Sequence, residues 1–340
     1  MRNVRYTQFV AAAVVYAAFA VYLYRHYFRD FGSPRLQDLF VVAAPLASLG
    51  CYVLSRRWVA GFAGSFFAGA LYGFGPFTLG LVRFHPTAGL LAAAIPWLFW
   101  PAVFGPKGRW RFLRVLLSVL PFAAIVLFFQ VAAYVRLYPI PIQLKLSAAD
   151  VAGLFAPLVA ANRQMTLMGF YHIPLTGLIV GLFVLIAARR IKIVAILAVP
   201  TILAFCHSVF AVSPVVWLAI SMLCGSVVVG TGTQALLYAG LADRKWVLSA
   251  CLVMGALAIA TLLCATECFQ KFAGLGSGYA MLFVHTAEMY VLGAIATAIL
   301  YFVVRAKLRV HALRLLVLCA PMALDIFFSA RFVIDRVLFI

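Results

Sequence analysis

Acidic residues are scarce in this chain, and so are charged residues of every kind. The 340 residues include only 8 Asp and Glu, charged residues together make up 10% of the chain, and hydrophobic residues make up 66%. So little polar surface cannot cover a water-soluble protein of this size. The composition therefore excludes a soluble globular domain and indicates an integral membrane protein.

Several signatures of known chemistry are also missing. The chain has no glycine-rich loop before a Lys-Ser or Lys-Thr pair, no His-Glu-x-x-His and no Gly-x-Ser-Gly. These are the patterns of phosphate-binding loops, zinc proteases and serine proteases. No two histidines share a helical ligand spacing, so we expect no metal site, and the sequence names no cofactor.

The formal net charge of +19 does not indicate a nucleic-acid partner. The Lys and Arg residues lie in short clusters between apolar runs rather than along one basic face. Membrane topology and anionic lipid headgroups explain such clusters. The expected partners are therefore the lipid bilayer and a small-molecule or ion substrate.

Apolar runs long enough to cross a bilayer recur along the whole chain, and a crossing segment must satisfy its own backbone hydrogen bonds. We therefore predict an all-α polytopic bundle that forms a single membrane domain over residues 1–340. About eleven spans are predicted: 8–28, 38–55, 59–83, 86–104, 115–135, 170–188, 193–213, 214–241, 246–267, 279–304 and 312–330. The basic clusters place the N-terminus in the cytoplasm and the C-terminus outside, in what we expect to be a bacterial plasma membrane.

An internal echo suggests two repeats. Residues 55–59 read Ser-Arg-Arg-Trp-Val and residues 243–247 read Asp-Arg-Lys-Trp-Val, an offset of 188 (246 − 58). The echo favours parallel halves, 1–190 and 191–340, related by an axis along the membrane normal. Two ordinary cytoplasmic turns would produce the same pattern, because basic residues stay inside and Trp prefers the interface.

A second pattern overlaps the later echo. Residues 241–245 read Leu-Ala-Asp-Arg-Lys, which resembles the loop signature of the major facilitator transporters. The resemblance covers about one turn and implies a transporter built from two parallel halves. The chain has Ala239 where that family has glycine before the leucine, Trp246 follows Lys245, and a twelfth span is missing.

One outer connection, 137–169, is long. Ser147 and Asp150 form a capping-box pattern. Apolar residues then follow on one helical face: Val151, Leu154, Phe155, Leu158 and Val159. We predict an amphipathic helix over 148–162 that lies in the outer interface, as a connector or as a lid over the bundle.

Only Glu288 and Asp325 are acids that lie clearly inside predicted spans. A carboxylate at mid-bilayer is costly and needs a partner or water. His285 precedes Glu288 by three residues, so the two share a face and form a candidate proton-coupling pair. A polar pair that only holds helices together is the alternative. Asp325 needs a partner from another helix, which the sequence does not name.

Small and polar residues gather in the predicted span 214–241. Gly230, Thr231, Thr233 and Gln234 follow one another closely. A glycine-dense segment lets helices pack closely, and it can also unwind to expose backbone carbonyls to a substrate. These four residues are therefore candidates to line a transport path.

The first functional hypothesis is a secondary transporter for small molecules or ions, with proton coupling through His285, Glu288 and Asp325. The alternative is an outer-face enzyme acting on lipid-linked substrates, similar to lipid-linked sugar transferases. There Asp30 or Asp38 would be the base, and Arg163 or His172 would hold an anionic headgroup. A third possibility is a non-catalytic membrane subunit, so the sequence leaves open whether the protein is an enzyme.

Overall fold

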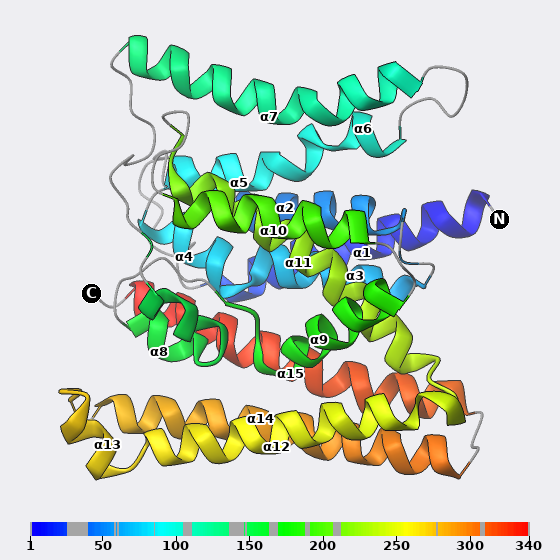
Figure 1. The fold of residues 1–340 in the computed structure, drawn as a ribbon, viewed down its shortest axis with the longest axis vertical. Helices are drawn as coiled ribbons and strands as arrows, with labels where there is room; N and C mark the ends of the chain where they lie inside the picture. Colours follow the sequence, from blue (N-terminus) through cyan, green and yellow to red (C-terminus); the bar gives the residue numbers. More distant parts are fainter. Residues whose placement is uncertain are drawn as a thin grey trace.

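The structure is a computed structural model. It describes residues 2–25, 40–57, 59, 61–84, 86–104, 111–135, 146, 148–162, 169–187, 191–206, 212–276, 278–306 and 310–338. Every regular element in these residues is helical (Figure 1). The candidate residues Asp30, Asp38 and Arg163 lie outside the described residues.

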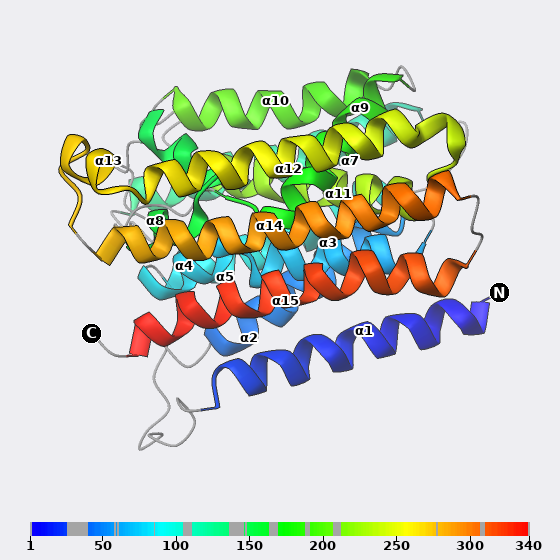
Figure 2. The ribbon, with the colours of Figure 1, turned by 90° about the horizontal axis from the view of Figure 1, so that it is seen from below.

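The helices follow one another in this order: α1 (Arg2–Leu23), α2 (Phe40–Ser55), α3 (Phe62–Phe74), α4 (Pro76–Phe84), α5 (Pro86–Leu98), α6 (Trp100–Phe104), α7 (Arg111–Tyr134), η3 (Ala148–Leu154), α8 (Pro157–Asn162), α9 (His172–Ala187), α10 (Ile191–Phe205), α11 (Pro214–Leu237), η5 (Leu241–Asp243), α12 (Arg244–Cys264), α13 (Glu267–Phe272), α14 (Gly278–Arg305) and α15 (His311–Leu338). The long helices run along one common direction, and the chain ends lie at opposite ends of it (Figures 1 and 2).

Six helical segments of the described chain are long and apolar enough to cross a membrane: Tyr6–Leu23, Phe62–Val82, Pro214–Leu237, Leu241–Cys264, Gly278–Arg305 and His311–Asp335. Shorter apolar helices lie among them: Val41–Ser55, Ala88–Leu98, Val119–Tyr134 and His172–Ile186. The prediction of an all-α chain is therefore confirmed for the described residues, and the long apolar helices suggest an integral membrane protein, whereas the number of eleven spans is not confirmed.

The helix α11 lies at the centre of the bundle. It packs against α9, α3 and α10, and most of its side chains are buried. The hairpin of α12 and α14 forms an outer layer on one side, and α7 lies on the opposite side (Figure 1). Much of the surface of α12 and α14 is exposed and apolar, as expected for helices that face lipid.

The two predicted repeat halves differ in their packing. In the first half, α2 packs against both α3 and α5. In the second half, α11 takes the place of α2, but within the described residues it has no comparable contact with α12 or α14. The helix neighbours therefore give no support to the repeat.

A break between α3 and α4 interrupts one of the long segments. Pro76 has no backbone N–H, so the carbonyl of Tyr72 loses its helical donor. The hydroxyl of Thr78 donates to that carbonyl instead, with an O–O distance of 2.5 Å. A Cβ at Gly75 would lie 2.1 Å from the carbonyl oxygen of Leu71, so only glycine fits at the break. The local residues Gly75, Pro76 and Thr78 therefore determine the break, and the carbonyl that loses its helical donor still accepts a hydrogen bond.

The predicted amphipathic helix 148–162 is not continuous. The chain forms the 3-10 helix η3, leaves it at Phe155, and starts α8 at Pro157. The α conformation is unfavourable for the residue before a proline, here Ala156, and this explains the interruption. The η3–α8 segment packs against α4, α14 and α15, so it contacts three helices of the bundle.

Candidate functional site

A buried histidine–aspartate pair joins α9 to α15. His172, the first residue of α9, places its Nδ1 2.8 Å from Oδ1 of Asp325, and both side chains are completely buried. The second carboxylate oxygen, Oδ2, accepts a hydrogen bond of 2.9 Å from the backbone N–H of Ile173. Both oxygens of Asp325 are therefore engaged by the start of α9.

The location of Asp325 explains this geometry. The first N–H groups of a helix have no intrahelical acceptor, and the helix dipole favours a negative charge there. Asp325 lies 14 residues from the start of α15 and 13 residues from its end (325 − 311 and 338 − 325), so α15 carries its carboxylate halfway along its length. The N-terminus of α9 thus receives its anionic cap deep inside the bundle.

Two tyrosines connect the pair to the interruptions in the fold. Tyr171 donates its hydroxyl to the carbonyl of Phe74, the last residue of α3 before the break. Tyr290 of α14 places its ring against His172 edge-to-face, with ring centroids 4.9 Å apart. Its hydroxyl donates to the carbonyl of Phe155, with an O–O distance of 2.6 Å. The pair therefore lies where α9 begins, beside the α3–α4 break and the η3–α8 segment.

Three buried polar atoms near the pair have no hydrogen-bond partner in the described structure. They are Nε2 of His172, Oγ1 of Thr176 and Oγ of Ser329. Thr176 lies one turn after His172 on α9, and Ser329 lies one turn after Asp325 on α15. Leaving such groups unpaired in a protein interior costs free energy. They are therefore positions where water, a proton or a ligand would be stabilised.

The imidazole of His172 uses only one of its two ring nitrogens in a hydrogen bond of the described structure. When Nδ1 carries the proton that Asp325 accepts, Nε2 is left as a proton acceptor. If Nε2 takes a proton, the resulting imidazolium stays paired with the carboxylate. The pair is neutral overall when the imidazole carries both protons, and it carries the single negative charge of Asp325 when Nε2 is unprotonated.

The structure places His285 and Glu288 elsewhere. Nδ1 of His285 lies 3.0 Å from Oε2 of Glu288, and the two side chains are 45% and 57% exposed. Tyr290, two residues further along α14, turns inward to His172. Residues two apart lie on different sides of a helix, so Glu288 faces away from Asp325. The predicted trio of His285, Glu288 and Asp325 is therefore not brought together.

The predicted path-lining residues lie at close helix crossings. A Cβ on Gly230 would lie 2.6 Å from the carbonyl oxygen of Gly64 on α3. α11 is a continuous helix here and is not unwound. Thr231 donates to its own helix at Val227, while Thr233 is 1% exposed. Gln234 covers Gly61 with its amide. Close packing accounts for Gly230, while Oγ1 of Thr233 and Oε1 of Gln234 are buried without a hydrogen-bond partner in the described structure.

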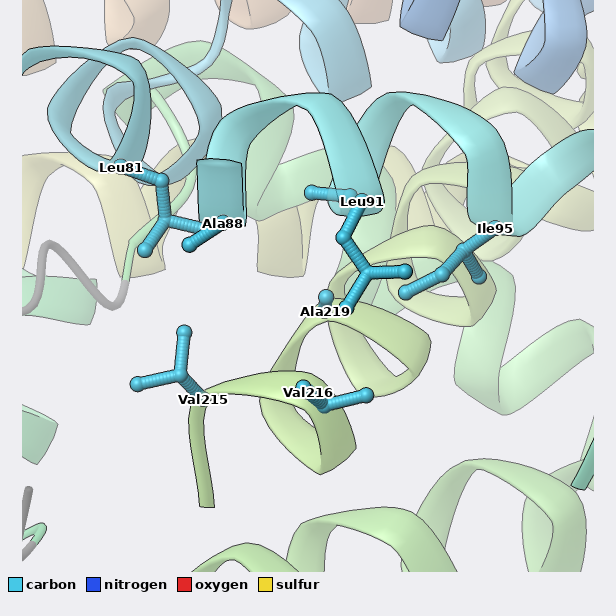
Figure 3. Close-up of a pocket in the computed structure, with 8 residues that line it drawn as sticks. Leu81, Ala88, Leu91, Ile95, Val215, Val216 and Ala219 are labelled. Carbon is cyan, nitrogen blue, oxygen red and sulfur yellow. The ribbon is translucent and has the colours of Figure 1, made fainter. Parts of the chain in front are cut away.

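A narrow apolar crevice lies where α4 and α5 meet α11 (Figure 3). It is lined only by aliphatic side chains: Leu81, Ala88, Leu91, Ala92, Ile95, Val215, Val216 and Ala219. It offers no polar group to orient a substrate and no charge to move one. The crevice is therefore a packing gap and not a candidate site.

Sequence reasoning found Asp325 but missed its partner. As a headgroup ligand, His172 is expected on the outer face, whereas the structure buries its side chain completely. Two sequence features could have indicated the pair. His172 lies at the start of an apolar span, and Asp325 is an acid in the middle of another span and needs a partner. Within the described residues, no group of three or more His, Cys, Asp or Glu side chains could hold a metal ion.

No family model, no curated protein and no solved structure matches the chain.

Proposed function

We propose that the protein is a proton-coupled secondary transporter for a small molecule or ion, and that His172 and Asp325 form its coupling pair. One observation carries the proposal: a fully buried histidine and aspartate meet halfway along α15, where α9 begins. Ionisable side chains inside membrane helices are costly, and they mark proton relays and substrate paths in transporters.

The discontinuous helices around the pair support this function. Transporters often place substrate and ion sites at the middle of the membrane, where interrupted helices present free backbone groups. Here α9 begins at the pair, and the carbonyl that Tyr171 engages belongs to the α3–α4 break. Irregular backbone at this depth is tolerated only where protein or a water-filled cavity surrounds it.

The chain path is consistent with eleven crossings. If α3 with α4, and α5 with α6, each count as one crossing, the candidates in the described chain are α1, α2, α3–α4, α5–α6, α7, α9, α10, α11, α12, α14 and α15. An odd number puts the chain ends on opposite sides, as Figure 1 draws them. The basic clusters then place the N-terminus inside and the C-terminus outside.

The η3–α8 segment would be the outer gate in this mechanism. Tyr290 contacts the segment through Phe155 and contacts His172 with its ring. Protonation of His172 changes the charge directly beside that ring, so it would bias the contact that holds the segment in place. Opening the segment would connect the pair to the outer solution.

A second function is favoured by one feature of the same pair. An aspartate that orients Nδ1 of a histidine and leaves Nε2 free is the arrangement of a general base. An enzyme acting on lipid-linked substrates could use it within the membrane. Because His172 is completely buried, such a substrate would have to enter between the helices rather than dock in an outer groove.

The transporter proposal predicts a charge movement that follows pH. We expect purified protein, reconstituted into liposomes on a solid-supported membrane, to give a transient current when the external pH is stepped. Asp325→Asn is expected to reduce this current at least tenfold, because it removes the charge that stabilises a protonated His172. The matched control is Glu288→Gln, which removes an exposed membrane carboxylate and is expected to leave the current nearly unchanged. A current that depends on Glu288 and not on Asp325 would move the coupling site back to α14.

A further inference from the structure

A stripe of exposed side chains runs along the outer side of α14. Its members are Met281, Val284, Glu288, Val291, Ile295, Ile299 and Phe302. All are apolar except Glu288, beside which lies His285. The spacing alternates between three and four residues over most of this length, which is the pattern of a seam between two parallel helices.

The ionisable pair lies too deep for a headgroup region. Glu288 is ten residues after Gly278 (288 − 278), so it lies about 15 Å along a helix of 28 residues. About 20 residues span the hydrocarbon core, which leaves only the first few residues of α14 outside it. A half-exposed carboxylate and imidazole facing hydrocarbon are unfavourable. Something polar must therefore cover them in the membrane.

We propose that a second copy of this chain covers the pair, and that the exposed stripe of α14 is a homodimer interface. The pair is complementary to itself: within one chain Nδ1 of His285 faces Oε2 of Glu288, which leaves Nε2 and Oε1 for the other chain. Under a two-fold axis along the membrane normal, two such pairs close a ring in which each imidazolium donates from Nδ1 to its own Glu288 and from Nε2 to the partner's Glu288, so the ring forms with both histidines protonated. Lipid tails offer neither a donor nor an acceptor.

The apolar members of the stripe complete the interface. Val284 and Val291 flank Glu288 by one turn on either side and supply side chains for knobs-into-holes packing. A single polar position in an otherwise apolar seam fixes register and the number of chains. The stripe faces away from His172 and Asp325, so this inference does not depend on the proposed function.

The test is the monomer–dimer equilibrium of the full chain in liposomes, measured by single-molecule photobleaching over a range of protein-to-lipid ratios. Wild type is expected to dimerise, and His285→Ala with Glu288→Ala is expected to raise the dimer dissociation constant at least tenfold. Exchanging the two residues, His285→Glu with Glu288→His, keeps the self-complementarity and is expected to restore dimers.

The matched control is the exposed pair Glu267 and Lys271 on α13, which lies outside the stripe. Replacing both with alanine is expected to leave the dissociation constant unchanged. A photo-crosslinking residue at Val291 is expected to join two copies, whereas the same residue at the exposed Val21 of α1 is not. Monomeric wild type, or an alanine variant that dimerises like wild type, would overturn the proposal.

Discussion

Alanine at Asp325 is expected to lower the free energy of unfolding by about 3–5 kcal/mol, the usual cost of removing one partner of a buried ion pair. The substitution leaves Nδ1 of His172 and the N–H of Ile173 without acceptors in a completely buried site. It also removes the negative charge at the N-terminus of α9. Unfolding by SDS in mixed micelles, followed by circular dichroism, measures the loss.

Two further variants test whether the loss of stability comes from the His172–Asp325 interaction rather than from any substitution in α15. His172→Ala combined with Asp325→Ala is expected to cost clearly less than the sum of the two single variants, because the first change already removes the interaction. Arg331→Ala breaks an exposed ion pair to Asp335 on the same helix, with an N–O distance of 3.1 Å. It is expected to change stability by no more than about 0.5 kcal/mol. Additive single variants would mean that His172 and Asp325 do not act as a unit.

Alanine at Gly232 is expected to cost about 3 kcal/mol or more, at the upper end of overpacking effects. A Cβ there would lie 1.8 Å from the carbonyl oxygen of Gly177 on α9. That oxygen belongs to helical backbone, so the clash is relieved only by moving α9 away from α11. Because α9 carries His172 at its start, we expect the same variant to reduce the pH-step current.

Gly255 provides the matched control for this substitution. It lies in α12, and a Cβ added there would meet nothing within 4 Å. The change Gly255→Ala is therefore expected to stabilise the protein by about 0.5–1 kcal/mol, the ordinary gain from alanine in a helix interior. Equal effects at Gly232 and Gly255 would show that α9 and α11 are not in close contact.

The helical class was predictable because it follows from composition and from the length of apolar runs. The η3–α8 break was harder to predict, although Pro157 was visible, because the apolar periodicity continues across it. The repeat rested on two short basic turns. Such turns recur for topological reasons alone, and the packing of α2 and α11 differs. Local sequence similarity carried no information on helix neighbours.

The candidate site was only half predictable. Asp325 was recognisable as an acid at mid-span, whereas His172 lies 153 residues away and is paired with it only by tertiary packing. Glu288 looked equivalent to Asp325, since both are acids in apolar runs. The structure distinguishes the two acids, because Asp325 lies on the buried side of α15 and Glu288 on the exposed side of α14. In helices that are apolar on all sides, the sequence pattern gives little information on which side is buried.

The central claim is that solvent reaches the buried pair during a transport cycle. The direct measurement is labelling of Ser329→Cys by a membrane-impermeant thiol reagent, added from each side of proteoliposomes in a variant that lacks the native cysteines. The matched control is Ser226→Cys on α11, a buried serine whose hydroxyl is satisfied by the carbonyl of Met222. The account predicts labelling at residue 329 from at least one side and none at residue 226. Protection of residue 329 from both sides would show that His172 and Asp325 are a sealed structural clasp.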